Sequence, residues 1–243
     1  MLSEVKPYTK EEDSKKEQVR RMFDRIAPHY DSLNMFLSAG MDRRWRKTAI
    51  GMLGVPSHAI VLDVATGTGD LAFEIARQYA DAKITGLDLA ENMLVEARKK
   101  STKRELDHRL DFTQGDSEEL PFENESFHSV SVAFGVRNFG NLSKGMNEIY
   151  RVLKPGGRLV VLEFTKPRSF PFKQLFQFYF KHILPRVGSF GSGDKRAYHY
   201  LYESVQAFPD YDRFTAVLSK NGFTNAAYKV LSLGICAIYT AEK

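Results

Sequence analysis

The feature that most constrains this fold is an alternation, from residue 59 onward, of short apolar runs with longer amphipathic stretches. The apolar runs cover residues 59–64, 83–88, 110–114, 129–134 and 159–164. Stretches with helical spacing lie between them, at 71–79, 92–100 and 143–153. Apolar runs of strand length that alternate with helices are typical of parallel sheets, which helices cover on both faces. The sequence therefore predicts a doubly wound α/β fold.

The C-terminal part of the pattern adds an antiparallel element. A helical stretch at 211–220 is followed by two adjacent strand patterns, at 223–231 and 234–241, which a short turn joins. Neighbouring strands with so short a connection pair antiparallel. We therefore predict a mostly parallel, Rossmann-like sheet of seven strands that closes with an antiparallel hairpin, an unusual ending for a dinucleotide-binding fold.

The N-terminal part has a different character. Residues 1–25 are rich in charge and poor in apolar side chains, so we expect them to be frayed or loosely docked. Apolar residues recur at helical spacing over 18–53, where Pro28 interrupts the pattern and a second helix is expected at 42–53. We therefore divide the chain into a helical part, 1–55, and a sheet domain, 56–243, that carries an insert at about 167–208.

Composition excludes several classes of protein. The chain of 243 residues has no apolar run long enough to span a membrane and no secretory signal, and its single cysteine, Cys236, excludes an internal disulfide and a cysteine-based zinc site. A cytoplasmic protein is expected. The net charge is +5, and residues 168–200 combine six Lys and Arg and one acid with nine Phe and Tyr. That stretch suits a nucleic acid, a membrane surface, an aromatic substrate, or a solvated face over core aromatics.

A glycine-rich loop marks the expected binding site. The sequence DVATGTGDLA (63–72) places Gly67 and Gly69 between the first strand and the next helix, in the pattern G-x-G-x-x-G/A. Glycines there let a ligand approach the backbone, and the helix N-terminus offers free N–H groups. Asp88 ends the second strand, 21 residues after Gly67, where it can accept both hydroxyls of a ribose. Dinucleotide and S-adenosylmethionine enzymes both use such an acid, although a tight turn alone would also explain the glycines.

Acidic side chains around the loop favour the sulfonium cofactor. Asp63 and Asp70 flank the loop, where they would repel a pyrophosphate and attract a cationic methionine group. Asp116, next to Ser117 after the third strand, can accept a hydrogen bond from an adenine amino group. Asp70 could instead favour a helix N-terminus and Asp116 could cap a turn, but four carboxylates on one rim fit a binding site better. The predicted S-adenosylmethionine-binding residues are Asp63, Gly67, Thr68, Gly69, Asp88, Asp116 and Ser117.

These segments resemble the class I S-adenosylmethionine-dependent methyltransferases. DVATGTGD is similar to their first motif, with Ala65 where many members have glycine, and LDLAENML (87–94) to their second. LPFENESFHSVSVAFGVRN (120–138) resembles their fourth-strand region, and EIYRVLKPGGRLVVLEF (148–164) resembles the turn into their fifth strand. The resemblance implies a seventh, antiparallel strand, in agreement with the expected hairpin.

A closer resemblance covers nearly the whole chain from about residue 18. Four segments carry it: YDSLNMFLSAGMDRRW (30–45), FGVRNF (134–139), RVLKPGGRLVVLEFT (151–165) and YHYLYESVQAFP (198–209). Together they resemble the ubiquinone/menaquinone biosynthesis C-methyltransferases. The sequence departs from that family at Asp42, where histidine is usual, and at Ala133, where some members have a serine near the cofactor.

The resemblance implies a reaction and a substrate class. The reaction is methyl transfer from S-adenosylmethionine to a ring carbon of a polyprenylated quinol, with demethylmenaquinol as the first choice. The benzoquinol step of ubiquinone synthesis, or both steps in one enzyme, are alternatives. An RNA methyltransferase would fit the basic, aromatic stretch, but no RNA-binding motif is present, so no nucleic-acid partner is expected. A non-catalytic relative is disfavoured by the intact loop and by Asp88.

The resemblance also implies residue roles. Arg137 and Asn138 are expected to act on the quinol, the arginine as partner of a phenolate and the asparagine as a holder of a phenol or a water. Tyr30 and Asp31 are expected to close over cofactor and substrate, within a helical cap formed by residues 1–55. The insert is expected to bind substrate. The chemistry requires no metal, and the oligomeric state stays open, a homodimer included.

The insert also predicts a membrane contact. Within 169–186 an apolar stripe follows helical spacing and consists of Phe172, Leu175, Phe176, Tyr179, Phe180 and Ile183. Lys173 and Lys181 lie beside this stripe. A helix packed on the sheet would have the same pattern, but a polyprenyl substrate must be taken from a bilayer. We therefore predict peripheral binding to the anionic inner face of the cell membrane.

Overall fold

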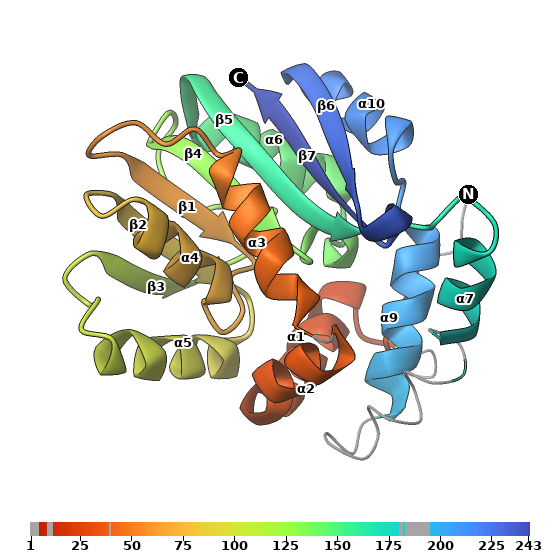
Figure 1. Ribbon diagram of the computed structural model, residues 1–243. Coiled ribbons are helices and arrows are strands. Elements are labelled where there is room, and N and C mark those ends of the chain that lie inside the picture. The colour runs from red at the N-terminus through yellow and green to blue at the C-terminus, as the bar shows by residue number, and fades with distance from the viewer. Residues whose placement is uncertain (1–4, 9–11, 39, 180–181, 183–194) are drawn as a thin grey trace.

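A seven-stranded sheet runs through the centre of the protein (Figure 1), in a computed structural model that describes residues 5–8, 12–38, 40–179, 182 and 195–243. The strands are β1 (Ile60–Val64), β2 (Lys83–Asp88), β3 (Leu110–Gln114), β4 (Phe127–Ala133), β5 (Leu153–Phe164), β6 (Thr224–Leu231) and β7 (Cys236–Glu242). Their order across the sheet is β3-β2-β1-β4-β5-β7-β6. β1 to β5 pair in parallel, and β7 pairs antiparallel with β5 and β6. The predicted fold class, including the C-terminal hairpin, is confirmed.

Helices bury both faces of this sheet. One layer consists of α3 (Met41–Gly51), α4 (Asp70–Gln78) and α5 (Glu91–Lys103). The opposite layer consists of α6 (Leu142–Val152) and α10 (Asp212–Lys220). In β1, Val61 packs in the first layer and its neighbour Leu62 in the second. Because successive side chains of a strand point to opposite faces, a strand between two helical layers buries apolar side chains on both faces.

The strand order reverses between β1 and β4, and this reversal creates the crevice in which a ligand can bind. β2 and β3 extend the sheet on one side of β1, and β4 and the later strands extend it on the other. Val64 pairs with Leu87 of β2 and with Val132 of β4, so the loops that follow these three strands begin at one level. Ligands of open α/β sheets bind at such a reversal, beyond the carboxyl ends of the strands.

The remaining helices gather over this carboxyl edge. They are α1 (Lys15–Ile26), α2 (Tyr30–Leu37), α7 (Phe172–Phe178) and α9 (Lys195–Ala207), with the 3-10 turns η1 (Ala27–His29), η2 (Val136–Asn138) and η4 (Ser232–Gly234). Figure 1 shows α1 and α2 beneath the ends of the central strands, and α7 beside α9. The segments expected to form a cap and an insert thus lie at the same edge of the sheet as the glycine loop.

The expectation that residues 1–25 are frayed or loosely docked is wrong from residue 14 onward. The Ser14 hydroxyl accepts a hydrogen bond from the Glu17 backbone N–H and caps α1. Val19 and Met22 are buried against α7 and α9, whereas Ile26 packs against α5. The few apolar residues of this charged segment lie on one helical face, which is sufficient to dock it.

The predicted apolar stripe of the insert is only partly correct. α7 ends at Phe178, and Phe180, Lys181 and Ile183 lie outside the described residues. Phe176 is 6% exposed and packs into the cluster formed with α1 and α9, whereas Leu175 is 60% exposed. The stripe is therefore divided, because a single short helix can bury only one of its faces against the protein.

Candidate active site

A cavity lies beyond the carboxyl ends of β1 to β4, beneath α1. Its wall includes Gly67 after β1, Asp88 at the end of β2, Asp116 and Ser117 after β3, and Asn138 after β4. Its open volume is about 90 Å³. Sites for small molecules usually exceed roughly 300 Å³. The cavity between α1 and the strand ends is therefore smaller than a typical site of that kind.

Two lysines hold α1 over the cavity. Lys16 forms an ion pair with Asp116, and its Nζ lies 3.4 Å from a carboxylate oxygen of Glu118. Burial opposes the charge of Lys16, but these two carboxylates raise its pKa above the usual value. Lys15 Nζ donates to the backbone carbonyl of Arg137 at 3.2 Å. The sequence prediction missed Lys16 and Glu118, although the capping Ser14 was a visible signal that a helix begins here.

The glycine loop takes a conformation that favours glycine. Gly67 and Gly69 have φ angles of +57° and +83°, in the left-handed region that costs other residues about 1–2 kcal/mol. A Cβ at position 69 would also lie 2.9 Å from the Phe73 ring. The Gly67 N–H donates to Asp88 Oδ2 at 2.8 Å. The loop is thus fastened to the end of the neighbouring strand.

Asp88 is poised to accept further hydrogen bonds. One oxygen accepts from the Gly67 N–H and the other from the Ala90 N–H at 2.9 Å. A carboxylate offers about four lone-pair directions, so two remain for ligand hydroxyls. Burial raises the pKa of Asp88 to about 6, although its backbone hydrogen bonds favour the ionised form.

Asp63 lies beneath the loop and not on the described wall of the cavity. Its side chain is buried and accepts hydrogen bonds from the hydroxyls of Thr66 at 2.6 Å and Ser131 at 2.7 Å. Burial raises the pKa of Asp63 to about 6. The position of this carboxylate fits a support for the loop.

Asp70 is likewise engaged within the protein. Its carboxylate forms ion pairs with Arg46 Nη2 and with Lys100 Nζ, each at 3.0 Å. Burial opposes its charge, but these two cations lower the pKa of Asp70. Among the described residues, the acids on the cavity wall are Asp88, Asp116 and Glu118. The electrostatic argument for a cationic ligand must therefore rest on those three acids and not on the two that flank the loop.

The residues expected to close over the site divide into two groups. Tyr30 lies on the cavity wall, and burial raises its pKa. Asp31 accepts a hydrogen bond from Thr68 Oγ1 at 2.5 Å and pairs with Lys100 at 2.6 Å. Asp31 and Thr68 thus tie α2 to the loop, and neither they nor Gly69 belong to the described wall.

The two departures from the family pattern have different surroundings. Asp42 is buried, accepts from the Ser38 hydroxyl at 2.6 Å and forms an ion pair with Arg46. Because Arg46 also pairs with Asp70, Asp42 links α3 to the start of α4. Ala133 lies on the cavity wall, where it contributes only a methyl group.

Arg137 and Asn138 occupy η2, directly after β4. Arg137 Nη1 lies 2.8 Å from Glu163 Oε1 and also donates to the carbonyl of Phe134. The side chains of Arg137 and Glu163 are 6% and 0% exposed, so this ion pair is buried. Burial raises the pKa of Glu163, although the nearby guanidinium opposes that shift. The sequence prediction missed Glu163. The only sequence signal for this residue is its position at the end of β5.

The two polar groups of η2 also have unused hydrogen-bonding capacity. Asn138 lies on the cavity wall, and its Oδ1 is buried with no hydrogen-bond partner among the described residues. The same holds for Nε of Arg137. A buried polar atom without a partner is costly, so its presence at a cavity points to a bound ligand or water.

The seven-stranded sheet, its reversal of strand order and its antiparallel C-terminal strands define a class I methyltransferase fold. The model of the ubiE/COQ5 methyltransferase family matches residues 11–243. The chain therefore belongs to that family, and the prediction of an S-adenosylmethionine-dependent methyltransferase is confirmed.

Named relatives match over nearly their full length. The demethylmenaquinone methyltransferase of Porphyromonas gingivalis is 46% identical over 98% of both chains. That of Bacteroides fragilis is 43% identical over 98% of this chain and 97% of its own. The ubiquinone/menaquinone biosynthesis C-methyltransferase UbiE of Geotalea daltonii is 44% identical over 94% of this chain and 97% of its own.

Solved structures share the fold at lower identity. The [4+2]-cyclase SpnF is 21% identical, with a TM-score of 0.60, and the match covers 94% of this chain and 96% of that one. A methyltransferase of Aquifex aeolicus is 17% identical, with a TM-score of 0.56, and the match covers 81% of this chain and 88% of that one. Because this fold carries different chemistries, the substrate must be argued from the family and the site.

Proposed function

We propose that the protein methylates a ring carbon of demethylmenaquinol with S-adenosylmethionine as the methyl donor. The observation that carries this proposal is the agreement, over nearly the whole of both chains, with relatives named demethylmenaquinone methyltransferase. The UbiE relative keeps the benzoquinol step as a second candidate.

The cavity residues suit the cofactor. Asp88 has free lone pairs at the end of β2, where it would accept the ribose hydroxyls, and Gly67 brings the backbone close. Asp116 and Ser117 would face the adenine once Lys16 moves aside. When bound, the cofactor supplies an electrophilic methyl group on a cationic sulfur, which the acids of the wall would attract.

The substrate residues act on a ring that is already activated. A partly ionised phenol directs electron density onto its ortho carbon, so the protein must fix distance and angle, stabilise negative charge on the oxygen, and let the ring proton leave. Asn138 is suited to hold the phenol or a water through its amide. Arg137 supplies positive charge and, through its pair with Glu163, fixes the position of η2. An arginine paired in this way is not a proton acceptor.

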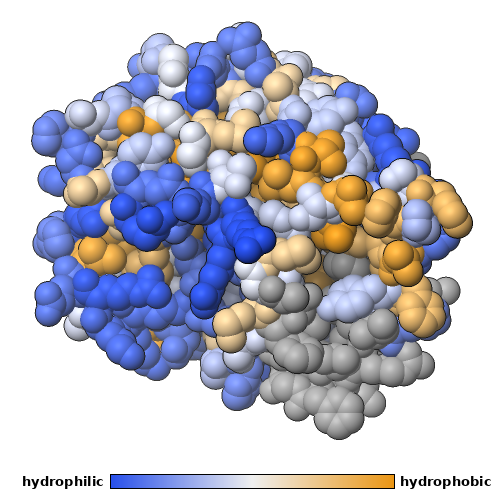
Figure 2. Space-filling model, viewed as in Figure 1, coloured by the Kyte–Doolittle hydropathy of each residue, from blue (hydrophilic) through white to orange (hydrophobic). Residues whose placement is uncertain are grey.

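The parts over the carboxyl edge would then serve as cap and substrate insert. Residues 1–55 would close the cofactor site through α1 and α2, and the insert at about 167–208 would receive the substrate tail. Among the described residues, no helix combines the length and apolar content needed to cross a bilayer. Peripheral contact through α7 is proposed instead, because Phe170, Leu175 and Phe178 are 80%, 60% and 59% exposed. Figure 2 shows hydrophobic side chains gathered on the side of the molecule where α7 lies.

A methyl-transfer assay with a short-chain demethylmenaquinol tests the proposal. We expect the methylated quinol by mass spectrometry, and we expect Asn138→Ala to lower kcat about hundredfold while cofactor affinity stays nearly unchanged. Asn147→Ala, at an exposed position of α6, is the matched control and should retain full activity. Absence of product with the wild-type protein, or full turnover by Asn138→Ala, would refute the corresponding part of the proposal.

A further inference from the structure

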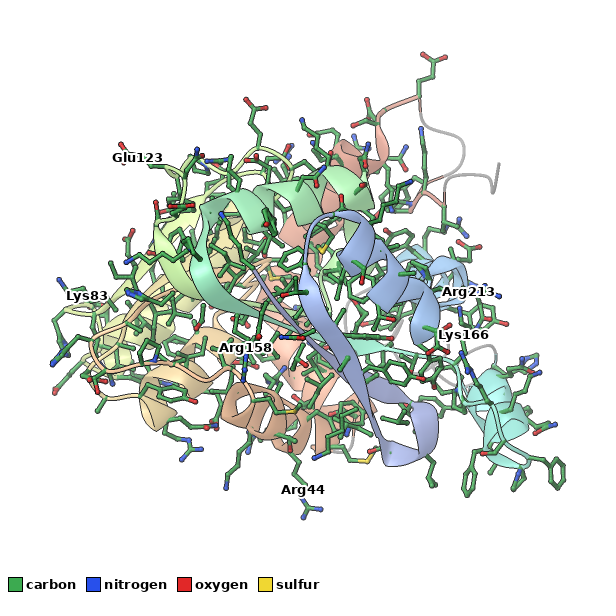
Figure 3. The ribbon with its side chains drawn as sticks, turned by 90° about the horizontal axis from the view of Figure 1, so that it is seen from above. Arg44, Lys83, Glu123, Arg158, Lys166 and Arg213 are labelled. Carbon is green, nitrogen blue, oxygen red and sulfur yellow. The ribbon has the colours of Figure 1, made fainter. Side chains whose placement is uncertain are left out.

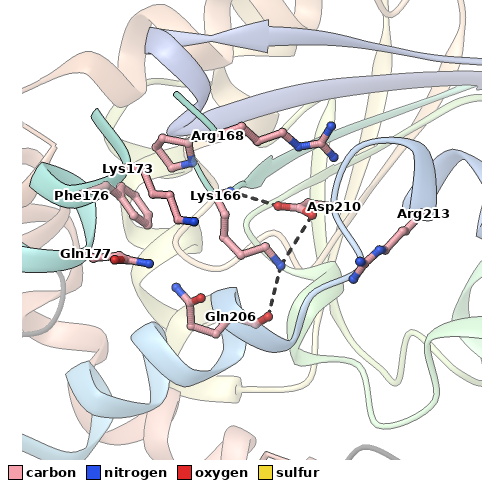
Figure 4. A pocket seen from close by; sticks show the side chains of 9 residues that line it. Lys166, Arg168, Lys173, Phe176, Gln177, Gln206, Asp210 and Arg213 are labelled. Atoms are coloured by element: carbon pink, nitrogen blue, oxygen red, sulfur yellow. Dashed lines mark hydrogen bonds and ion pairs between the residues drawn. The ribbon is translucent and has the colours of Figure 1, made fainter. Parts of the chain in front are cut away.

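A second cavity lies beside α7, on the face of that helix that carries Phe176, and apart from the first cavity. It has a volume of about 390 Å³ and shares no described lining residue with the first cavity. The segment after β5, α7, the end of α9 and the start of α10 form its wall (Figure 4). Its charged residues are Lys166, Arg168, Lys173 and Arg213 against the single carboxylate of Asp210, so the formal charge is 4 − 1 = +3.

Lys166 is the residue of this wall that the surrounding protein holds most firmly in place. Its Nζ donates to the backbone carbonyls of Gln206 at 3.1 Å and Phe208 at 2.8 Å, and lies 3.5 Å from Asp210 Oδ1. Burial lowers the pKa of Lys166, and the charges of Arg213 and Arg168 add to this effect against the opposing Asp210. The Lys166 amino group is thus held in place by the protein, because its hydrogen bonds go to two backbone carbonyls beside Asp210.

Other donors point into the open space. Figure 4 shows Lys173 of α7, Gln206 of α9 and Arg213 of α10 directed toward the same region. Gln206 Nε2 is buried with no hydrogen-bond partner among the described residues. For the ends of Lys173 and Arg213, the described part of the chain offers no ion pair. Converging cationic donors and a spare amide donor are the arrangement that binds phosphate oxygens.

The surroundings of the cavity indicate where such a phosphate comes from. On α7, Lys173, Phe176 and Gln177 face the cavity, whereas Leu175 and Phe178, with Phe170 just before the helix, are exposed on its other side. An apolar face bordered by cations is typical of a surface that lies in the interface of an anionic bilayer. In a bilayer, phosphate groups lie just above the acyl chains that such a face would enter.

We infer that this cavity binds the phosphate of an anionic phospholipid headgroup while α7 rests on the bilayer. The inference extends the proposed membrane contact from a general attraction to one defined site. Arg213 and Lys173 contact the phosphate oxygens, Gln206 adds a neutral donor, and Lys166 supplies fixed charge behind them.

Vesicle co-sedimentation of the full-length protein tests this site. The vesicles contain phosphatidylcholine alone or with phosphatidylglycerol. The pocket variant is Lys173→Gln/Arg213→Gln, and the control is Arg44→Gln/Lys83→Gln, which removes the same two residue types at exposed positions without a described side-chain partner. Figure 3 shows Lys83 on the side of the molecule opposite Lys166 and Arg213.

We expect the pocket variant to lose about thirtyfold in partition onto anionic vesicles, since each cation near an anionic leaflet contributes roughly fivefold. The control should change by less than about threefold, and neutral vesicles should not distinguish the proteins. Equal losses in both variants would overturn the inference, because diffuse surface charge would then explain binding. Calorimetric binding of inorganic phosphate to the wild-type cavity, with vesicle binding unchanged in the pocket variant, would assign the cavity to a soluble phosphate and overturn the lipid headgroup.

Methyl transfer to a short-chain quinol separates this inference from the proposed function. That reaction needs neither a bilayer nor the long substrate tail that the insert would receive, so both variants should retain wild-type turnover. Loss of turnover in the pocket variant alone would overturn the assignment of the cavity to membrane contact. If the wild-type protein itself transfers no methyl group, the proposed reaction fails, while the vesicle comparison still decides the headgroup site.

Discussion

If Asp88 binds the ribose as proposed, cofactor affinity should depend on pH through this carboxylate, and the size of the effect can be calculated. Burial raises its pKa to about 6. Only the ionised carboxylate can accept two ribose hydroxyls beside its two backbone N–H groups, because protonation converts an acceptor position into a donor. With that pKa, about nine-tenths of Asp88 is ionised near pH 7 and about one-tenth near pH 5. The apparent Kd should therefore rise about tenfold between these values, or about 1.4 kcal/mol.

Calorimetry of S-adenosylmethionine binding across this pH range is the assay. Asp88→Asn should bind more weakly than wild type near pH 7, by about tenfold, and should lose most of the pH dependence. Asp107→Asn, at an exposed position before β3 with no described side-chain partner, is the control and should keep the wild-type profile. A flat wild-type profile, or an unchanged slope in Asp88→Asn, would refute a ribose contact by this carboxylate.

The raised pKa values of Asp63 and Asp88 do not unfold the protein at low pH, so they cannot weaken cofactor binding in that way. Burial raises the pKa values of Asp63 and Asp88 to about 6, from the ordinary value of 3.8. Between these values the folded state holds protons that the unfolded state has released. For these two groups, stability therefore rises as the pH falls through about 6 toward about 4. Thermal unfolding at each pH verifies that the protein used in the binding assay is folded.

Two further predictions concern stability, measured by urea unfolding. Arg137→Ala leaves Glu163 buried without its cation and should destabilise the fold by about 3–5 kcal/mol, whereas Arg137→Ala/Glu163→Gln should recover a large part of this loss; equal stability of the two variants would contradict a buried pair. Gly69→Ala should cost about 2 kcal/mol or more, because of its positive φ and the nearby Phe73 ring. Gly51→Ala, which meets open space at the end of α3, is the control and should be neutral or stabilising; similar losses in both glycine variants would refute the conformational argument.

The alternation of strands and helices was predictable, because the spacing of apolar residues in the sequence distinguishes the two kinds of element. Strands between two helical layers are rich in apolar residues on both faces, and the short connection between β6 and β7 favours antiparallel pairing. The docking of α1 was not predictable from composition, because a charged helix needs only a few apolar residues on one face. Strand order across the sheet also depends on crossovers that no local pattern encodes.

The candidate site divides in the same way. Residues at strand ends were placed on the cavity wall, because the carboxyl ends of parallel strands meet at one edge; Gly67, Asp88, Asp116 and Asn138 are examples. Within a loop, side chains follow no period, so sequence did not reveal that Thr68 points to α2 and not into the cavity. Residues that contact the site from distant parts of the chain, such as Lys16 and Glu163, were not predicted, because no local sequence pattern marks such contacts.

The turn η2 links the two halves of the site. Arg137, at its centre, is fixed from beneath by Glu163 at the end of β5. From above, Lys15 of α1 donates to the carbonyls of Arg137 and Phe139, at 3.2 and 2.7 Å. Asn138 lies between these two carbonyls and on the cavity wall. Because Lys15 bonds the turn that carries Asn138, we propose that the position of α1 and the placement of this amide depend on the same contacts.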